Sequence, residues 1–214
     1  MKRIELIENY LDELFPSPKC ELTYSKDYEL LISVMLSAQT IDKRVNEVTS
    51  VLWNKYKTLE DLKNADIDDL KDILKPLGNY NKKSEYVSGI ATILVDKYHS
   101  VMPRLRKNLE ELPGVGRKTV NVVFAELNIE PNIAVDTHVE RVSKRLDLSK
   151  ETDNVFLVEK HLRKIFKKNT WSKRHLQMVL FGRYKCKAIN PICEDCKLKE
   201  ICNYYKNKAR SSRK

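Results

Sequence analysis

An amine stands at an electrostatically unfavourable position in the stretch LPGVGRKTVNVV, residues 112–123. A proline and two glycines interrupt the chain there, and an apolar run then begins with Arg117 and Lys118. If this run is a helix, both cations lie at the positive end of its dipole, which disfavours each charge by roughly 0.3–1 kcal/mol. Such a location would disfavour the ammonium form, so the neutral amine of Lys118 is a candidate nucleophile. The residues alone favour the other interpretation, in which Lys118 contacts a phosphate as a fixed charge, because phosphate-binding lysines are common.

The surrounding segment, residues 105–127, predicts a short helix, a tight PGVG turn and a second helix. Gly114 and Gly116 can adopt positive φ and let another backbone approach closely. The amides at the start of the second helix then form an anion site. Such a helix-hairpin-helix holds a DNA phosphate without reading the base sequence, whereas an ordinary helix–helix turn is the alternative.

A carboxylate that can serve this amine is Asp136, in the stretch AVDTHVERVSKRL. Asp136 precedes a helical pattern and fits the N-cap position, where its side chain accepts backbone hydrogen bonds. An N-cap carboxylate at the edge of a cleft can also assist an amine on a neighbouring helix. The nearby His138 is interpreted as a structural hydrogen-bonding residue.

Four of the five cysteines fall within 17 residues, with the spacing C-x6-C-x2-C-x5-C: Cys186, Cys193, Cys196 and Cys202. Four thiolates this close in sequence can surround one metal centre at little cost in chain entropy. Zinc and an iron–sulfur cluster both accept four thiolates, and the spacing leaves the choice open. Cys20 stands apart and is expected to be a small core residue. Four lysines in or beside this loop can present charge to a phosphate backbone or form a solvated basic face: Lys185, Lys187, Lys197 and Lys199.

The composition is that of a globular chain, because 42% of the 214 residues are hydrophobic and only 5 are glycine and 7 proline. The opening stretch MKRIELIENYLDELF carries charges throughout, and no window has the length of a membrane span. We therefore expect a cytoplasmic protein, associated with the nucleoid if bacterial, whose thiols stay reduced. The formal net charge of +10 suggests a polyanionic partner, although a lysine-rich composition without a basic patch gives the same total.

Helical periodicity runs through almost the whole sequence and predicts an all-α fold with about ten helices. The segment YELLISVMLSAQ is apolar nearly all round, so a helix capped by Ser25 should be central and buried. Thr58 and Asp66 are further cap candidates, each followed three residues later by Asp, and Pro76 with Gly78 ends the second of these helices. The valine-rich stretch 119–127 would suit a strand equally well, but no second strand exists to pair with it, so it is interpreted as helix. The other predicted helices cover 3–15, 41–57, 66–75, 80–98, 136–147, 153–167 and 171–184, and the last residues, KNKARSSRK, are expected to fray.

Several stretches in this order resemble the endonuclease III family of base-excision DNA glycosylases, within the helix-hairpin-helix superfamily. The matching stretches run from about residue 28 to 202: LLISVMLSAQTID, PLGNYNKKSE, LEELPGVGRKTVNVV, IAVDTHVERV and FGRYKC with the four-cysteine loop. The resemblance implies a bilobal all-α protein. Residues 20–130 would form a six-helix barrel lobe that contains the helix-hairpin-helix, and residues 1–19 plus 131–214 would form a second lobe with a [4Fe–4S] cluster on Cys186, Cys193, Cys196 and Cys202.

The resemblance also implies a reaction and a partner. Lys118 would attack the sugar C1′ of an oxidised pyrimidine nucleotide flipped out of double-stranded DNA, form a Schiff base, and cut the strand 3′ to the abasic site by β-elimination. Asp136 would stabilise the cationic sugar or help proton transfers, and the cluster would take no redox part in base removal. Gln39 would fill the gap left by the flipped nucleotide. The implied DNA-binding residues are Gln39, Asn79, Gly114, Gly116, Arg117, Lys185 and Lys187, and the implied state is a monomer.

Two residues depart from the family pattern. Asn79 stands where many relatives have an apolar wedge, often leucine, and Phe181 stands where a histidine is often found. Three rival interpretations compete with this one. An adenine glycosylase of the same superfamily would place glutamate at the position of Ser33 and lack Lys118, so both residues oppose it. The second rival is a non-catalytic DNA-binding module, and the third is a zinc protein.

Overall fold

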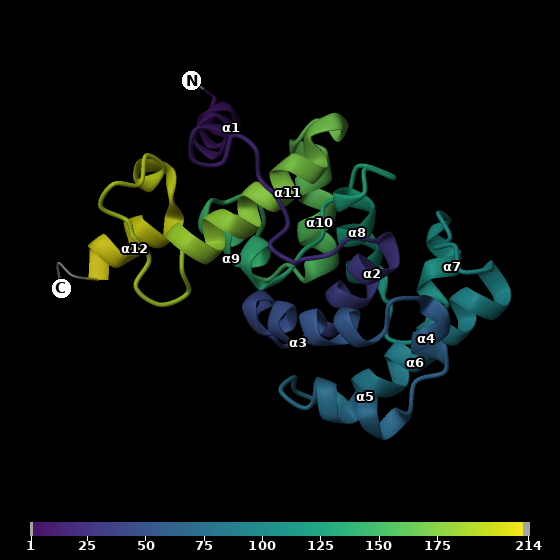
Figure 1. Cartoon of the computed structure of the whole chain (residues 1–214). Coiled ribbons are helices and arrows are strands. Elements are labelled where there is room, and N and C mark those ends of the chain that lie inside the picture. Colours follow the sequence, from purple (N-terminus) through teal and green to yellow (C-terminus); the bar gives the residue numbers. More distant parts are fainter. Residues whose placement is uncertain (1, 212–214) are drawn as a thin grey trace. The chain divides into compact units, whose positions relative to one another are not determined.

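The structure is a computed structural model that describes residues 2–211, with side chains to residue 207 (Figure 1). This part of the chain consists of helices, helical turns and loops, and it contains no strand. The all-α prediction is therefore confirmed. No helix within these residues has the length and apolar character needed to cross a membrane.

Twelve α-helices lie in the described residues: α1 Arg3–Leu14, α2 Asp27–Leu36, α3 Asp42–Lys55, α4 Leu59–Lys63, α5 Ile67–Leu74, α6 Tyr80–Tyr98, α7 Arg106–Glu110, α8 Arg117–Glu126, α9 Thr137–Arg145, α10 Val155–Ile165, α11 Trp171–Leu180 and α12 Asn203–Ser211. Two 3₁₀ turns, η1 Lys168–Thr170 and η3 Lys199–Ile201, and one π-helical turn, η2 Phe181–Lys185, join them.

The chain forms two compact units, residues 20–123 and a terminal unit of residues 1–19 with 124–214. The predicted lobes place this boundary at 130/131 instead of within α8. Their assignment as a barrel lobe and a cluster lobe stays a prediction.

The 20–123 unit is built around α2 and α6. Every residue of α2 after Asp27 is buried, as its apolar sequence predicts. The long helix α6 packs against α4, α5 and α2, and α3 packs against α2 and α5. Thr58 and Asp66 cap α4 and α5 as predicted, since their side chains accept backbone hydrogen bonds at the start of each helix.

The terminal unit gathers α1 and the helices after α8. α11 contacts α1 and α9, and α10 contacts α9. A buried polar clamp joins α1 to α11, because the Arg174 guanidinium donates to the Asp12 carboxylate at 2.8 and 3.0 Å and to Gln177 at 2.7 Å. This clamp fixes the N-terminal helix on the unit that carries the four-cysteine loop.

Three details of the predicted elements are wrong. Ser25 does not cap α2, because the helix begins at Asp27 and the Glu29 carboxylate accepts the Ser25 and Lys26 amides instead. The predicted helix 171–184 widens after Leu180 into the π-helical turn, where the Cys186 amide donates to the Phe181 carbonyl at 2.7 Å. Residues 206–211, expected to fray, belong to α12, and residues 212–214 lie outside the described part.

Candidate functional site

The predicted hairpin is present as α7, a tight turn and α8. Gly114 adopts a φ of 72°, and a β-carbon there would lie 2.4 Å from the Tyr86 ring. This residue must therefore be glycine for both conformational and steric reasons. A positive φ was also expected at Gly116, but this residue does not have one. A β-carbon at Gly116 would meet no atom within 4 Å, so the space beside the start of α8 is open.

Lys118 lies in the first turn of α8, and its side chain is exposed. It has no carboxylate partner within the 20–123 unit. Arg117 is exposed beside it, so two cations occupy the positive end of this helix, as the sequence predicts. The stretch 119–127, which resembled a strand in composition, is helical up to Glu126.

Gln39 and Asn79 line one open pocket of the 20–123 unit, of about 980 Å³ including the space it shares with solvent. Gly114 of the hairpin lines the same pocket, so three of the predicted DNA-binding residues are brought together. The side chains of Gln39 and Asn79 are exposed, and both residues have a left-handed backbone with a φ of 57°. Asparagine tolerates this conformation better than leucine does, which gives a local reason for Asn79 at this position.

A buried lysine that sequence reasoning missed lies beneath these two residues. Lys83 lines the same pocket, is only 5% exposed, and donates through Nζ to the Ala38 carbonyl at 3.0 Å and to Thr40 Oγ1 at 3.2 Å. Burial lowers the pKa of Lys83 below its ordinary value. A lysine in a helical pattern gives no sequence signal for this role, because its acceptors lie more than 40 residues earlier.

In the terminal unit, Asp136 is the N-cap of α9, as predicted. Its Oδ1 accepts the amides of His138 at 2.9 Å and Val139 at 2.8 Å, and the residue is half-buried. Within the described part of this unit its second carboxylate oxygen accepts no hydrogen bond. Lys118 belongs to the other unit, and the pairing of Lys118 with Asp136 stays a prediction.

Two arginines four residues apart on α9 hold the start of the cysteine loop. Arg141 donates to the Gly182 carbonyl at 2.7 Å and to the Cys186 carbonyl at 3.1 Å, and it contacts His138 Nδ1 at 3.1 Å. Arg145 donates to the Lys187 carbonyl at 2.7 Å and to the Cys186 sulfur at 3.4 Å. The i,i+4 spacing places both arginines on one face of α9 but does not indicate which groups they bind.

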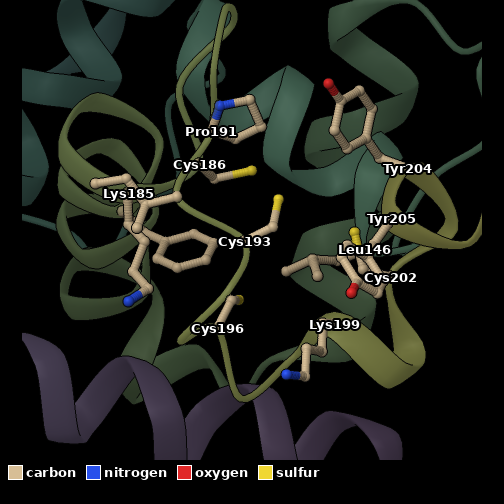
Figure 2. Close-up of a pocket in the computed structure, with 12 residues that line it drawn as sticks. Leu146, Lys185, Cys186, Pro191, Cys193, Cys196, Lys199, Cys202, Tyr204 and Tyr205 are labelled. Carbon is tan, nitrogen blue, oxygen red and sulfur yellow. The ribbon is translucent and has the colours of Figure 1, made fainter. Parts of the chain in front are cut away.

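All four clustered cysteines line a single pocket of about 350 Å³, part of which is open to solvent. Figure 2 shows them around this space, with the Cys186 and Cys193 sulfur atoms pointing into it. No three Cys, His, Asp or Glu side chains of the described residues are placed to hold a single metal ion. Four thiols that line one space are a donor set suited to a zinc ion or to an iron–sulfur cluster. Burial raises the pKa of the Cys186 and Cys196 thiols, and Arg145 opposes this effect at Cys186.

The lysines of the loop differ in their surroundings. Lys187 is exposed, whereas Lys185 and Lys199 line the cysteine pocket. Lys197 forms an ion pair with Glu13 of α1 at 2.6 Å. Lys197 therefore has an ion-pair partner within the unit.

Phe181 and Cys20, two further residues noted in the sequence, are both at least partly buried. Phe181, the second departure from the family pattern, is buried beside the cysteine pocket, with its ring edge-to-face to Tyr10 at 6.2 Å between centroids. It acts as a core residue between α1 and the loop. Cys20 is half-buried and belongs to the 20–123 unit, whereas the four clustered cysteines belong to the terminal unit.

Comparison with known proteins identifies the family. Residues 32–168 match the family model described as HhH-GPD superfamily base excision DNA repair protein. The endonuclease III of Bacillus subtilis (strain 168) is 42% identical over 94% of this chain and 92% of its own length. That of Rickettsia felis is 43% identical over 93% of this chain and 95% of its own length.

Solved structures agree with this match. A trapped endonuclease III–DNA covalent intermediate, in its estranged-adenine complex, superimposes with a TM-score of 0.92 at 42% identity and covers 98% of this chain and 100% of its own. A thermostable thymine-DNA glycosylase shares the fold, with a TM-score of 0.84 at 21% identity. The chain therefore belongs to the endonuclease III family of the HhH-GPD superfamily of base excision DNA repair proteins.

Proposed function

We propose that the protein is a bifunctional DNA glycosylase and abasic-site lyase that removes oxidised pyrimidines from double-stranded DNA. Membership of the family makes it a DNA glycosylase of base excision repair. The observation that carries the finer assignment is Lys118, an exposed amine in the first turn of the helix that follows a glycine hairpin. A 42% identical relative has been trapped in a covalent complex with DNA, which is the product expected of such an amine.

Lys118 is the nucleophile of this proposal. Its Nζ lone pair attacks C1′ of the damaged nucleotide, the bond from C1′ to the base breaks, and the base leaves with that electron pair. The bond from C1′ to the ring oxygen then breaks and leaves a protonated Schiff base. Loss of a proton from C2′ expels the 3′ phosphate by β-elimination, which cuts the strand on that side.

Asp136 supports this chemistry in two ways that its geometry allows. One carboxylate oxygen is used by the α9 amides, which hold the side chain in a single orientation. The other oxygen can stabilise the positive charge that develops on the sugar, or accept a proton during the later steps.

DNA contacts are assigned to the pocket and the hairpin of the 20–123 unit. The open space beside Gly116 lets a phosphate approach the first amides of α8, with Arg117 adjacent. Gln39 and Asn79 extend from one pocket rim into the gap that a flipped nucleotide leaves. Lys185 and Lys187 contact the backbone from the cysteine loop.

The cysteine pocket fits a [4Fe–4S] cluster held by Cys186, Cys193, Cys196 and Cys202. Four thiols line one space, and the Arg145 cation beside the Cys186 sulfur favours the thiolate that a metal centre requires. When bound, such a group cross-links the loop 186–202 and stabilises its fold. The base-removal steps above are made by Lys118 and Asp136.

Borohydride reduction tests the proposal. The protein is mixed with a duplex that contains one abasic site, and sodium borohydride reduces any Schiff base to a stable amine. We expect a covalent adduct with the native protein and with Lys107→Ala, a matched control that removes an exposed lysine of α7, and none with Lys118→Ala. Absence of the adduct in the native protein would favour a non-catalytic DNA-binding module.

A further inference from the structure

The buried lysine of the 20–123 unit connects the two exposed residues of its pocket. Lys83 lies one helical turn after Asn79, and its amide donates to the Asn79 carbonyl at 3.0 Å. Its ammonium donates to the carbonyl of Ala38 and the hydroxyl of Thr40, the two residues that flank Gln39. The Lys83 side chain therefore ties the turn around Gln39 to the first turn of α6, next to Asn79. The amide bond to Asn79 is the ordinary helical one and does not depend on the side chain.

Gln39 and Asn79 both have an unfavourable backbone conformation. A left-handed conformation costs an L-residue about 1–2 kcal/mol, although asparagine pays less than glutamine. Gln39 and Asn79 share a φ of 57°, so the surrounding structure must maintain the conformation. At Gln39 the two hydrogen bonds from Lys83 add to the turn bond that the Thr40 amide donates to the Ser37 carbonyl at 3.1 Å.

Fold stability alone does not account for this lysine. Lys83 is 5% exposed, and among the described residues no carboxylate forms an ion pair with its ammonium, so its charge is uncompensated. An uncompensated buried ammonium is costly, whereas a methionine of similar length would bury well. The acceptors lie near the surface, because Ala38 is exposed and Thr40 half-exposed, so water can replace the ammonium there.

We propose that Lys83 is a positioning residue that holds Gln39 and Asn79 as one preformed unit for insertion into the DNA gap. The inference rests on the proposed function, since it assumes that these two side chains meet DNA. Its contribution is pre-organisation: without Lys83 the turn would have to be ordered during binding, at a cost in affinity.

The test measures the dissociation constant for a duplex that contains an uncleavable tetrahydrofuran abasic analogue. For Lys83→Met we expect roughly tenfold weaker binding, the effect of losing charge-assisted hydrogen bonds. We expect an unchanged or higher melting temperature, whereas a merely structural lysine would lower it. Thr40→Val, which removes one of the two acceptors, should give a smaller loss of the same kind.

Two further variants separate positioning from simple charge. Lys82 lines the same pocket but pairs with Glu85 at 2.7 Å, so Lys82→Met removes an equal charge without touching the turn. It should weaken binding less than Lys83→Met does. Because Lys83 acts through Gln39, the double variant Gln39→Ala/Lys83→Met should bind close to Gln39→Ala alone.

Three binding results would each overturn the inference: native-like binding by Lys83→Met, an equal loss in Lys82→Met, or fully additive losses in the double variant. A marked fall in the melting temperature of Lys83→Met would also refute it. If the native protein does not prefer the abasic duplex to an undamaged one, the proposed function fails, and the inference fails with it. Failure of the inference alone leaves borohydride trapping by the native protein intact.

Discussion

Replacement of Asp136 by asparagine separates the structural use of this carboxylate from its proposed chemical use. Oδ1 of Asp136 accepts two amides of α9, at 2.9 and 2.8 Å. Asparagine is about as good an N-cap as aspartate, so Asp136→Asn should keep the cap and lose only the charge near the helix start, a change of roughly 0.3–1 kcal/mol. Asp136→Ala loses the cap as well, for about 1 kcal/mol in total.

For a chain of this length, 1 kcal/mol corresponds to a shift of about 2–4 °C in melting temperature. Both variants should therefore remain folded at 25 °C. The activity should respond differently, because an amide can neither accept the proton nor stabilise the cationic sugar. We expect both variants to lose roughly 10²- to 10³-fold in the single-turnover rate of base release.

Asp66 supplies the matched control for this experiment. It caps α5 in the same way, with Oδ1 accepting the amides of Asp68 at 2.8 Å and Asp69 at 3.1 Å. Asp66→Asn and Asp66→Ala should reproduce the small stability changes and leave the rate of base release native. A native rate in Asp136→Asn, or a loss that follows the unfolded fraction, would refute the chemical role of Asp136.

The remaining predictions concern the hairpin and the cysteine pocket. Gly116→Ala should fold normally and weaken duplex binding in a titration, because its methyl group would fill the open space assigned to a phosphate. Gly114→Ala should instead lower the melting temperature, because its methyl group would clash with the Tyr86 ring. Unchanged duplex binding by Gly116→Ala would contradict the phosphate site. The purified protein should absorb at about 400–420 nm and contain iron. Cys202→Ser should lose much of this absorbance, whereas Cys20→Ser should keep it. A colourless protein with stoichiometric zinc would contradict the iron–sulfur cluster.

Helix positions were predictable where local chemistry decides them. The predicted helix 80–98 coincides with α6. The helix begins and ends there because Asn79 and His99, the residues that flank it, have a left-handed backbone. The caps at Thr58, Asp66 and Asp136 follow from side chains that accept nearby amides. Ser25 is not the cap because the helix begins at Asp27, which places Lys26 at the N-cap position, and the Glu29 carboxylate accepts the Ser25 and Lys26 amides.

The site was predictable in its residue types and less so in its supports. The resemblance and the spacing identified Lys118, Asp136 and the four cysteines as candidates, and local sequence located their helices. Lys83 and the paired arginines of α9 escaped notice, because their partners lie more than 40 residues away in the chain. Long-range contacts between a side chain and a carbonyl leave no periodic signal, since any residue supplies the acceptor.

The π-helical turn after α11 restricts which residues its second position can accept. A β-carbon at Gly182 would lie 2.8 Å from the β-carbon of His138 and 3.2 Å from its α-carbon, near the beginning of α9. Because the second of these atoms is backbone, no rotation of a side chain can make room for it. Even alanine at position 182 would therefore displace the first turn of α9 and, with it, the Asp136 carboxylate that caps this helix. Gly182 would then affect the site although it has no part in the chemistry.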